Sequence, residues 1–240
     1  MEAFNFFGVQ RRALHLMLAL DCSNSMRGEK IKSLNYAMRA ALPAMRNAAE
    51  DNPEADVFLR ILRFGDVAAW LGPAIALHEA QWHDLEAEGL TSLGGALTLL
   101  AQELTPERLS GRILPPIVIL VSDGQPTDDY RAGFAAFEAA PLIRSGAARM
   151  AIAIGADVDR PILQRFMGEH GGPPLEARDA GELVNRMRWA SSVTIQAASR
   201  PALRSVLTQE EVAKPAGDPF IWDGGNERCR ELHGGGAFRI

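Results

Sequence analysis

Two short apolar segments, each followed by an aspartate, constrain the fold more than any other feature of this sequence. Residues 14–20 read LHLMLAL and precede Asp21, and residues 117–121 read IVILV and precede Ser122 and Asp123. Segments of this length and composition are typical of strands that are buried on both faces of a parallel sheet. Ligands of such sheets bind beyond the carboxyl ends of the strands, where both aspartates are expected to lie.

Segments with helical periodicity alternate with the strand segments. Between residues 29 and 49, apolar side chains recur every three or four positions, which predicts a helix with one buried face. The Gly65-Asp66 turn signal predicts that residues 56–64 and 67–71 form a hairpin at the sheet edge. The remaining predicted strands are 117–121, 150–154 and 175–177, and the remaining predicted helices are 91–100, 127–137, 159–167 and 180–196. The predicted fold class is α/β: a doubly wound, mostly parallel sheet with one antiparallel edge strand and helices on both faces.

Length and charge limit the domain organisation and the partners. A chain of 240 residues with 47% hydrophobic residues predicts one large domain, which we assign to residues 1–198. Residues 199–240 are predicted to be a tail, either a flexible arm or a strap on the domain. The formal net charge of −5 argues against nucleic acid and anionic membranes as partners. No apolar segment approaches the roughly 20 residues of a membrane span, no signal peptide pattern is present, and a cytoplasmic location is expected.

Three separated segments place side-chain oxygens at the expected site. Asp21, Ser23 and Ser25 follow the first strand, Thr91 precedes a helix, and Asp123 follows the 117–121 strand. Hydroxyls with one or two carboxylates suit a hard divalent cation that keeps some of its water. The sequence therefore predicts a Mg²⁺ site, with Mn²⁺ or Ca²⁺ as alternatives.

This arrangement, D-x-S-x-S followed by a distant Thr and an S-D-G segment, resembles the metal-ion-dependent adhesion site (MIDAS) of von Willebrand factor A (VWA) domains. The resemblance covers about residues 12–198. It is supported by the segments SMRGEK at 25–30, GLTSLGGAL at 89–97 and VSDGQPT at 121–127. It implies a Rossmann-like VWA fold with an intact site.

The resemblance also implies a role for each residue of the site. Ser23 and Ser25 would bind the ion through their hydroxyls, and Thr91 would bind it directly or through water. Asp21 and Asp123 would act mostly through bound water or as hydrogen-bond acceptors. The coordination would be completed by an Asp or Glu of a partner protein. The implied function is therefore a non-enzymatic, metal-dependent protein-interaction module.

Within the family, the G-x-T-S-L-G-x-A-L pattern resembles bacterial intracellular proteins associated with tellurite resistance. Those proteins tend to be encoded beside a PP2C-type metal-dependent phosphatase and a serine/threonine kinase. The resemblance implies a regulatory or assembly subunit with such partners in a stress or phospho-signalling system. An alternative is a kinase substrate or scaffold that is phosphorylated at Ser199, Ser205 or Thr208.

Other chemistry is less consistent with the sequence. Asp21 resembles the nucleophile of haloacid-dehalogenase-type phosphatases, but those enzymes need a carboxylate two residues later, where this chain has Ser23. The chain has no nucleophile elbow or phosphate-binding glycine motif. Other groups receive structural roles: a buried Cys22, an exposed tail thiol at Cys229, a solvated loop with His78 and His83, and helix caps at Asp128, Asp129, Asp157 and Asp159.

Overall fold

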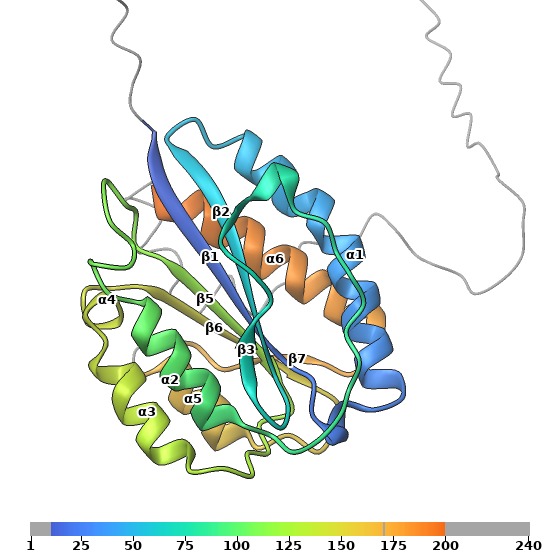
Figure 1. Cartoon of the computed structure of the whole chain (residues 1–240). Coiled ribbons are helices and arrows are strands. Elements are labelled where there is room, and N and C mark those ends of the chain that lie inside the picture. Colours follow the sequence, from blue (N-terminus) through green and yellow to red (C-terminus); the bar gives the residue numbers. More distant parts are fainter. Residues whose placement is uncertain (1–10, 170, 200–240) are drawn as a thin grey trace, which may run out of the picture.

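A mixed β-sheet forms the centre of the molecule (Figure 1). The computed structural model describes residues 11–169 and 171–199. Its strands lie in the order β3-β2-β1-β5-β6-β7, and β4 also pairs with β2. The strands are β1 (Arg12–Asp21), β2 (Ala55–Phe64), β3 (Ala68–Trp70), β4 (Ile75–Ala76), β5 (Ile117–Ser122), β6 (Ala148–Ile154) and β7 (Leu175–Ala177). The α-helices are α1 (Glu29–Glu50), α2 (Leu93–Glu103), α3 (Tyr130–Ala139), α4 (Pro141–Arg144), α5 (Arg160–Met167) and α6 (Ala180–Ser199), and 3₁₀ turns cover Asn24–Met26 and Leu77–Glu79.

The pairing of the strands confirms the predicted fold class. β1 is parallel to both β2 and β5, and β5-β6 and β6-β7 are also parallel. β3 pairs with β2 in the antiparallel sense, as the hairpin prediction requires. A second antiparallel segment, β4, was not predicted because two residues are too few to show a period of two.

Alternation along β1 divides the interior into two apolar layers. Leu14, Leu16 and Leu18 belong to the layer that also contains Met38 of α1 and Met187 of α6. Met17 and Ala19 belong to the opposite layer, which α2, α3 and α5 cover with a second set of buried side chains: Leu97, Phe134, Phe137, Leu163 and Phe166. Because both faces are covered, the strands are apolar at nearly every position, as the sequence indicated.

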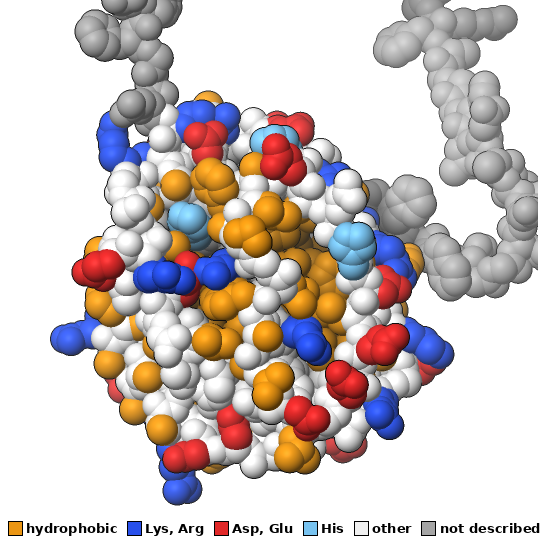
Figure 2. Space-filling model, in the orientation of Figure 1, with side chains coloured by type: hydrophobic (Ala, Val, Ile, Leu, Met, Phe, Trp, Pro, Cys, Tyr) orange, Lys and Arg blue, Asp and Glu red, His pale blue; other side chains and the backbone are white. Residues whose placement is uncertain are grey.

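The sheet edge at β3 and β4 carries a patch of apolar side chains on the face that Figure 2 shows. Its large exposed members are Val67, Leu71 and Ile75. No helix among the described residues is long and apolar enough to cross a membrane. Ser199, the first residue of the predicted tail, ends α6. Residues 200–240, with Ser205, Thr208 and Cys229, lie outside the described residues, and the form of the tail as arm or strap stays a prediction.

Candidate metal site

Asp21 is the last residue of β1, and its side chain is fully buried. Its Oδ1 accepts a hydrogen bond from the Ser23 backbone N–H at 2.9 Å, and its Oδ2 accepts one from the Ser122 hydroxyl at 2.6 Å. Burial raises the pKa of this carboxyl, the hydrogen bonds from Ser122 and Ser23 oppose that rise, and the nearby Asp123 adds to it. Both carboxylate oxygens are therefore held by the chain itself.

Ser23 and Ser25 lie in the turn that follows β1. Ser23 is buried and precedes the 3₁₀ turn Asn24–Met26, whereas Ser25 is exposed. The two hydroxyl oxygens are 2.9 Å apart, so one hydroxyl donates to the other. The i, i+2 spacing thus brings two neutral hydroxyl oxygens together, and their role as metal ligands stays a prediction.

Asp123 follows β5 directly and is fully buried. Its Oδ2 accepts a hydrogen bond from the Lys30 ammonium at 3.0 Å. Gly155 makes room for this lysine, because a Cβ at that position, where φ is +89°, would lie 2.8 Å from Lys30 Cε. Lys30 was not among the predicted site residues, although a basic residue in the first turn of the helix after the D-x-S-x-S loop was a usable signal.

Thr91 lies in a loop that is hydrogen-bonded to the β1 turn. The Glu88 N–H donates to the Cys22 carbonyl at 2.7 Å, and the Asn24 N–H donates to the Gly89 carbonyl at 2.9 Å. Thr91 is buried, and its backbone exchanges hydrogen bonds with Thr127: its N–H donates to Thr127 Oγ1 at 2.9 Å, and its carbonyl accepts from the Thr127 N–H at 3.0 Å. These contacts position Thr91 beside the serine loop.

Asp128 corrects the predicted helix caps. The residue before α2 is Ser92, whose side chain forms no capping hydrogen bond. Instead, the Asp128 carboxylate accepts hydrogen bonds from the N–H groups of Gly94 and Gly95, both at 3.0 Å. Asp129 precedes α3 without a side-chain cap, so the prediction that Asp128 and Asp129 cap their own helix was wrong. The predicted cap of α5 by Asp159 is confirmed, since it accepts from the Ile162 N–H.

The chemistry of these groups fits a hard divalent cation. Two buried carboxylates end neighbouring strands, and Lys30 is the cation that forms an ion pair with one of them. Within the described ranges no group of three or more His, Cys, Asp and Glu side chains could hold a metal, so a site here depends on hydroxyl ligands. His78 and His83 are exposed, as the solvated-loop prediction requires.

Cys22 is unsuited to nucleophilic chemistry. Its side chain is 1% exposed, and burial raises its pKa to about 12. The thiol is therefore protonated at neutral pH, which agrees with the structural role predicted for it.

Solved structures of VWA domains have a similar fold. A von Willebrand factor type A protein from Catenulispora acidiphila has a TM-score of 0.57 and 16% identity, over 77% of this chain and 43% of that chain. The manganese-loaded TRAP protein of Plasmodium vivax has a TM-score of 0.50 and 20% identity, over 72% of this chain and 71% of that one. Proximal thread matrix protein 1 from the mussel byssus, with a zinc-occupied MIDAS motif, has a TM-score of 0.52 and 14% identity, over 77% of this chain and 46% of that one.

These similarities define the class of fold: an α/β VWA-like domain with a mostly parallel sheet and an antiparallel edge. No protein-family model and no curated protein matches the chain. The chain spans less than half the length of the Catenulispora and mussel chains, so it corresponds to one part of those proteins.

Proposed function

We propose that this chain is a metal-dependent protein-interaction module. In this proposal Asp21, Ser23, Ser25, Thr91 and Asp123 form the site for Mg²⁺, and a partner protein presents an Asp or Glu to it. The observation that carries the proposal is the meeting of two fully buried carboxylates with a pair of serine hydroxyls 2.9 Å apart at the carboxyl ends of β1 and β5. Such a group of oxygens has an excess of negative charge that a cation would compensate.

The hydrogen bonds suggest which residues would bind the ion directly and which would support the site. The Ser23 and Ser25 hydroxyls would be direct ligands, because they already point to a common position. Asp21 would hold the loop, since both of its oxygens accept hydrogen bonds from the chain. The remaining lone pairs of its carboxylate would accept hydrogen bonds from metal-bound water. The Thr91 hydroxyl forms no hydrogen bond with the described residues and is free to join as a ligand. When bound, the ion would supply a positive centre for a partner's carboxylate.

Two structural neighbours support a divalent cation at such a site. The Plasmodium vivax protein is manganese-loaded, and the mussel protein carries zinc in its MIDAS motif. We propose Mg²⁺ for this chain because its predicted ligands are all oxygens, with Mn²⁺ or Ca²⁺ as alternatives.

Calorimetric titration of the metal-stripped chain with Mg²⁺, Mn²⁺ and Ca²⁺ tests the site. Wild type should bind a single ion, and Ser23→Ala/Ser25→Ala should lose binding while keeping its fold by circular dichroism. Ser145→Ala is the matched control, since that hydroxyl bonds only to Leu142 of its own helix. Retained metal binding by the double variant would refute the assignment of the site.

The interaction step needs a separate experiment. Partner capture should require Mg²⁺, should be lost with EDTA and should be lost in the double variant. In a partner so identified, replacement of one Asp or Glu by Asn or Gln should abolish metal-dependent binding. Binding that is indifferent to metal would leave the site without the proposed function.

A phosphatase of the haloacid-dehalogenase type is the rival enzymatic function. It is less consistent with the site, because Asp21 is fully buried and each of its oxygens already accepts a hydrogen bond from the chain, which hinders attack on a phosphate. Hydrolysis of a generic phosphate ester that Asp21→Asn abolishes would favour the enzyme instead.

We also propose, from the sequence resemblance to proteins associated with tellurite resistance, that the partners include a PP2C-type phosphatase and a serine/threonine kinase in the cytoplasm. The module would then be a regulatory or assembly subunit, or a kinase substrate. Metal-dependent co-purification with a phosphatase or kinase encoded nearby would support this pathway, and phosphorylation in the tail would support the substrate role.

A further inference from the structure

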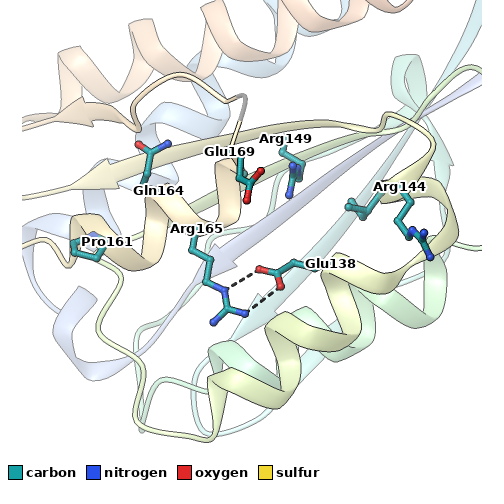
Figure 3. Close-up of a pocket in the computed structure, with 9 residues that line it drawn as sticks. Glu138, Arg144, Arg149, Pro161, Gln164, Arg165 and Glu169 are labelled. Atoms are coloured by element: carbon teal, nitrogen blue, oxygen red, sulfur yellow. Dashed lines mark hydrogen bonds and ion pairs between the residues drawn. The ribbon is translucent and has the colours of Figure 1, made fainter.

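A second pocket lies away from the metal site, between the ends of α3, α4 and α5 and the start of β6 (Figure 3). Its volume is about 740 Å³. Its charged lining consists of three arginines and two glutamates, namely Arg144, Arg149, Arg165, Glu138 and Glu169. The pocket therefore combines room for a small ligand with an excess of positive charge.

One pair of these charges compensates itself. Arg165 donates two hydrogen bonds to the Glu138 carboxylate, at 2.8 and 3.1 Å, which Figure 3 shows as dashed lines. This contact raises the pKa of Arg165. The Arg165 guanidinium also lies over the Phe134 ring, 4.5 Å from its centroid. Glu138 therefore accepts its hydrogen bonds from Arg165 and acts on Arg149 only by longer-range attraction.

Arg149 is the pocket's partly buried arginine without an ion pair to any described carboxylate. Its side chain is partly buried against Gly168, where an added Cβ would lie 2.0 Å from a guanidinium nitrogen. Within residues 11–169 and 171–199, no carboxylate forms an ion pair with Arg149 or with the exposed Arg144. Burial lowers the pKa of Arg149, and the longer-range attraction of Glu138 opposes that shift without reversing it. Both guanidinium groups are therefore available to an anion.

We propose that this pocket binds a phosphate group, with Arg149 as the anchor and Arg144 as the second contact. A guanidinium presents paired N–H donors that match the oxygens of a tetrahedral oxyanion, and two guanidiniums attract a dianionic phosphate more strongly than a monoanionic carboxylate. The phosphate can belong to a phosphorylated side chain of a partner or to a small phosphorylated molecule. Glu169 lies in the same pocket, and its negative charge repels a phosphate. Removal of that charge should therefore raise the affinity for phosphate.

Titration of the full chain with inorganic phosphate, in EDTA to remove any metal, tests the proposal. Wild type should show saturable binding, which Arg149→Met should weaken roughly tenfold or more and Glu169→Gln should strengthen. Arg149→Lys keeps the charge without the planar fork and should bind with intermediate affinity. Arg178→Met is the control, because that arginine is 76% exposed and pairs with Glu176 outside the pocket. Ser23→Ala/Ser25→Ala should bind phosphate normally, which separates this pocket from the metal site.

A phosphoserine peptide and its unphosphorylated form identify the source of the phosphate. Tighter binding of the phosphopeptide than of inorganic phosphate indicates a protein partner, and equal binding indicates a small phosphorylated molecule. Equal phosphate affinity of wild type and a folded Arg149→Met variant would overturn the proposal, as would the absence of phosphate binding by wild type.

Discussion

The candidate metal site and the arginine pocket differ in how the chain compensates their buried charges. In the metal site, the chain itself supplies donors to both oxygens of Asp21 and an ammonium to Asp123. In the pocket, Arg149 is partly buried and forms no ion pair with any described residue. The two carboxylates thus have hydrogen-bond or ion-pair partners within the chain, whereas Arg149 has only the longer-range attraction of Glu138.

Helix α5 connects the two regions. The N–H of Asp159, which caps α5, donates to the Asp123 carbonyl at 3.0 Å, while Arg165 and Gly168 at the other end line the pocket. The two regions contact opposite ends of this helix and share no residue. Each can therefore be changed by substitution while the other serves as its internal control.

The largest effect is expected from Asp21→Asn. The amide keeps the size of the side chain but removes its charge. In the proposed site, the Asp21 carboxylate holds the serine loop and accepts hydrogen bonds from metal-bound water. We expect Mg²⁺ affinity to fall by roughly 10- to 100-fold. The metal-free fold should lose little stability, because burial already disfavours the charged form of Asp21. Calorimetry and urea unfolding measure the two quantities, and unchanged affinity would show that Asp21 has no part in the site.

The next effect concerns the cap of α2. Asp128→Ala removes the acceptor of the Gly94 and Gly95 N–H groups, and we expect a loss of about 1–2 kcal/mol in the free energy of unfolding. Asp129→Ala is the matched control, since its side chain forms no capping hydrogen bond. Urea unfolding of both variants gives the comparison, and equal losses would contradict the cap assignment.

The sequence allowed the sheet to be predicted, because the two apolar segments that precede Asp21 and Asp123 are typical of buried parallel strands. That these residues bind a metal stays a prediction. The structure brings Asp21, Ser23 and Asp123 to one sheet edge, with Thr91 in the adjoining loop. These positions follow directly from where the strands end, and strand ends can be recognised in the sequence.

Contacts between distant segments could not be predicted in this way. Lys30 reaches Asp123 across 93 positions, and Asp128 caps a helix that begins 35 residues before it. A Ser/Thr/Asp cluster before a helix is a valid cap signal for that helix, but three-dimensional proximity redirected Asp128 to α2. The arginine pocket likewise draws on α3, α4, β6 and α5, and no spacing in the sequence indicates it.

A smaller effect is expected at Lys30. Its ammonium lies 3.0 Å from Asp123 Oδ2, so it competes electrostatically with a divalent cation. We expect Lys30→Met to raise Mg²⁺ affinity several-fold, up to roughly tenfold. Lys32→Met is the control, because Lys32 pairs with the exposed Glu29. A fall in affinity of Lys30→Met would mean instead that the lysine mainly holds Asp123 in place.

The smallest effect concerns the other end of β1, where His15 stacks on Phe58 with ring centroids 5.6 Å apart. Burial lowers the pKa of His15 below 6.5; Glu103 opposes this shift, and Arg60 adds to it. Above that pH the imidazole is neutral in both folded and unfolded chains. As the pH falls, the unfolded chain is protonated first, so this part of the stability is lost as the pH drops through the folded pKa.

Urea unfolding between about pH 7 and about pH 5 should therefore show a flatter profile for His15→Gln than for wild type. The raised pKa of Asp21 acts in the opposite direction, because its contribution is present at low pH and is lost as the pH rises. The chains with His15 and with His15→Gln should therefore also be compared in an Asp21→Asn background. If the two profiles stayed parallel there, His15 would carry no pH dependence. A difference between them would show that burial, the largest cause of the shift, makes His15 a pH-dependent contributor to stability at this end of β1, where no cation site is proposed.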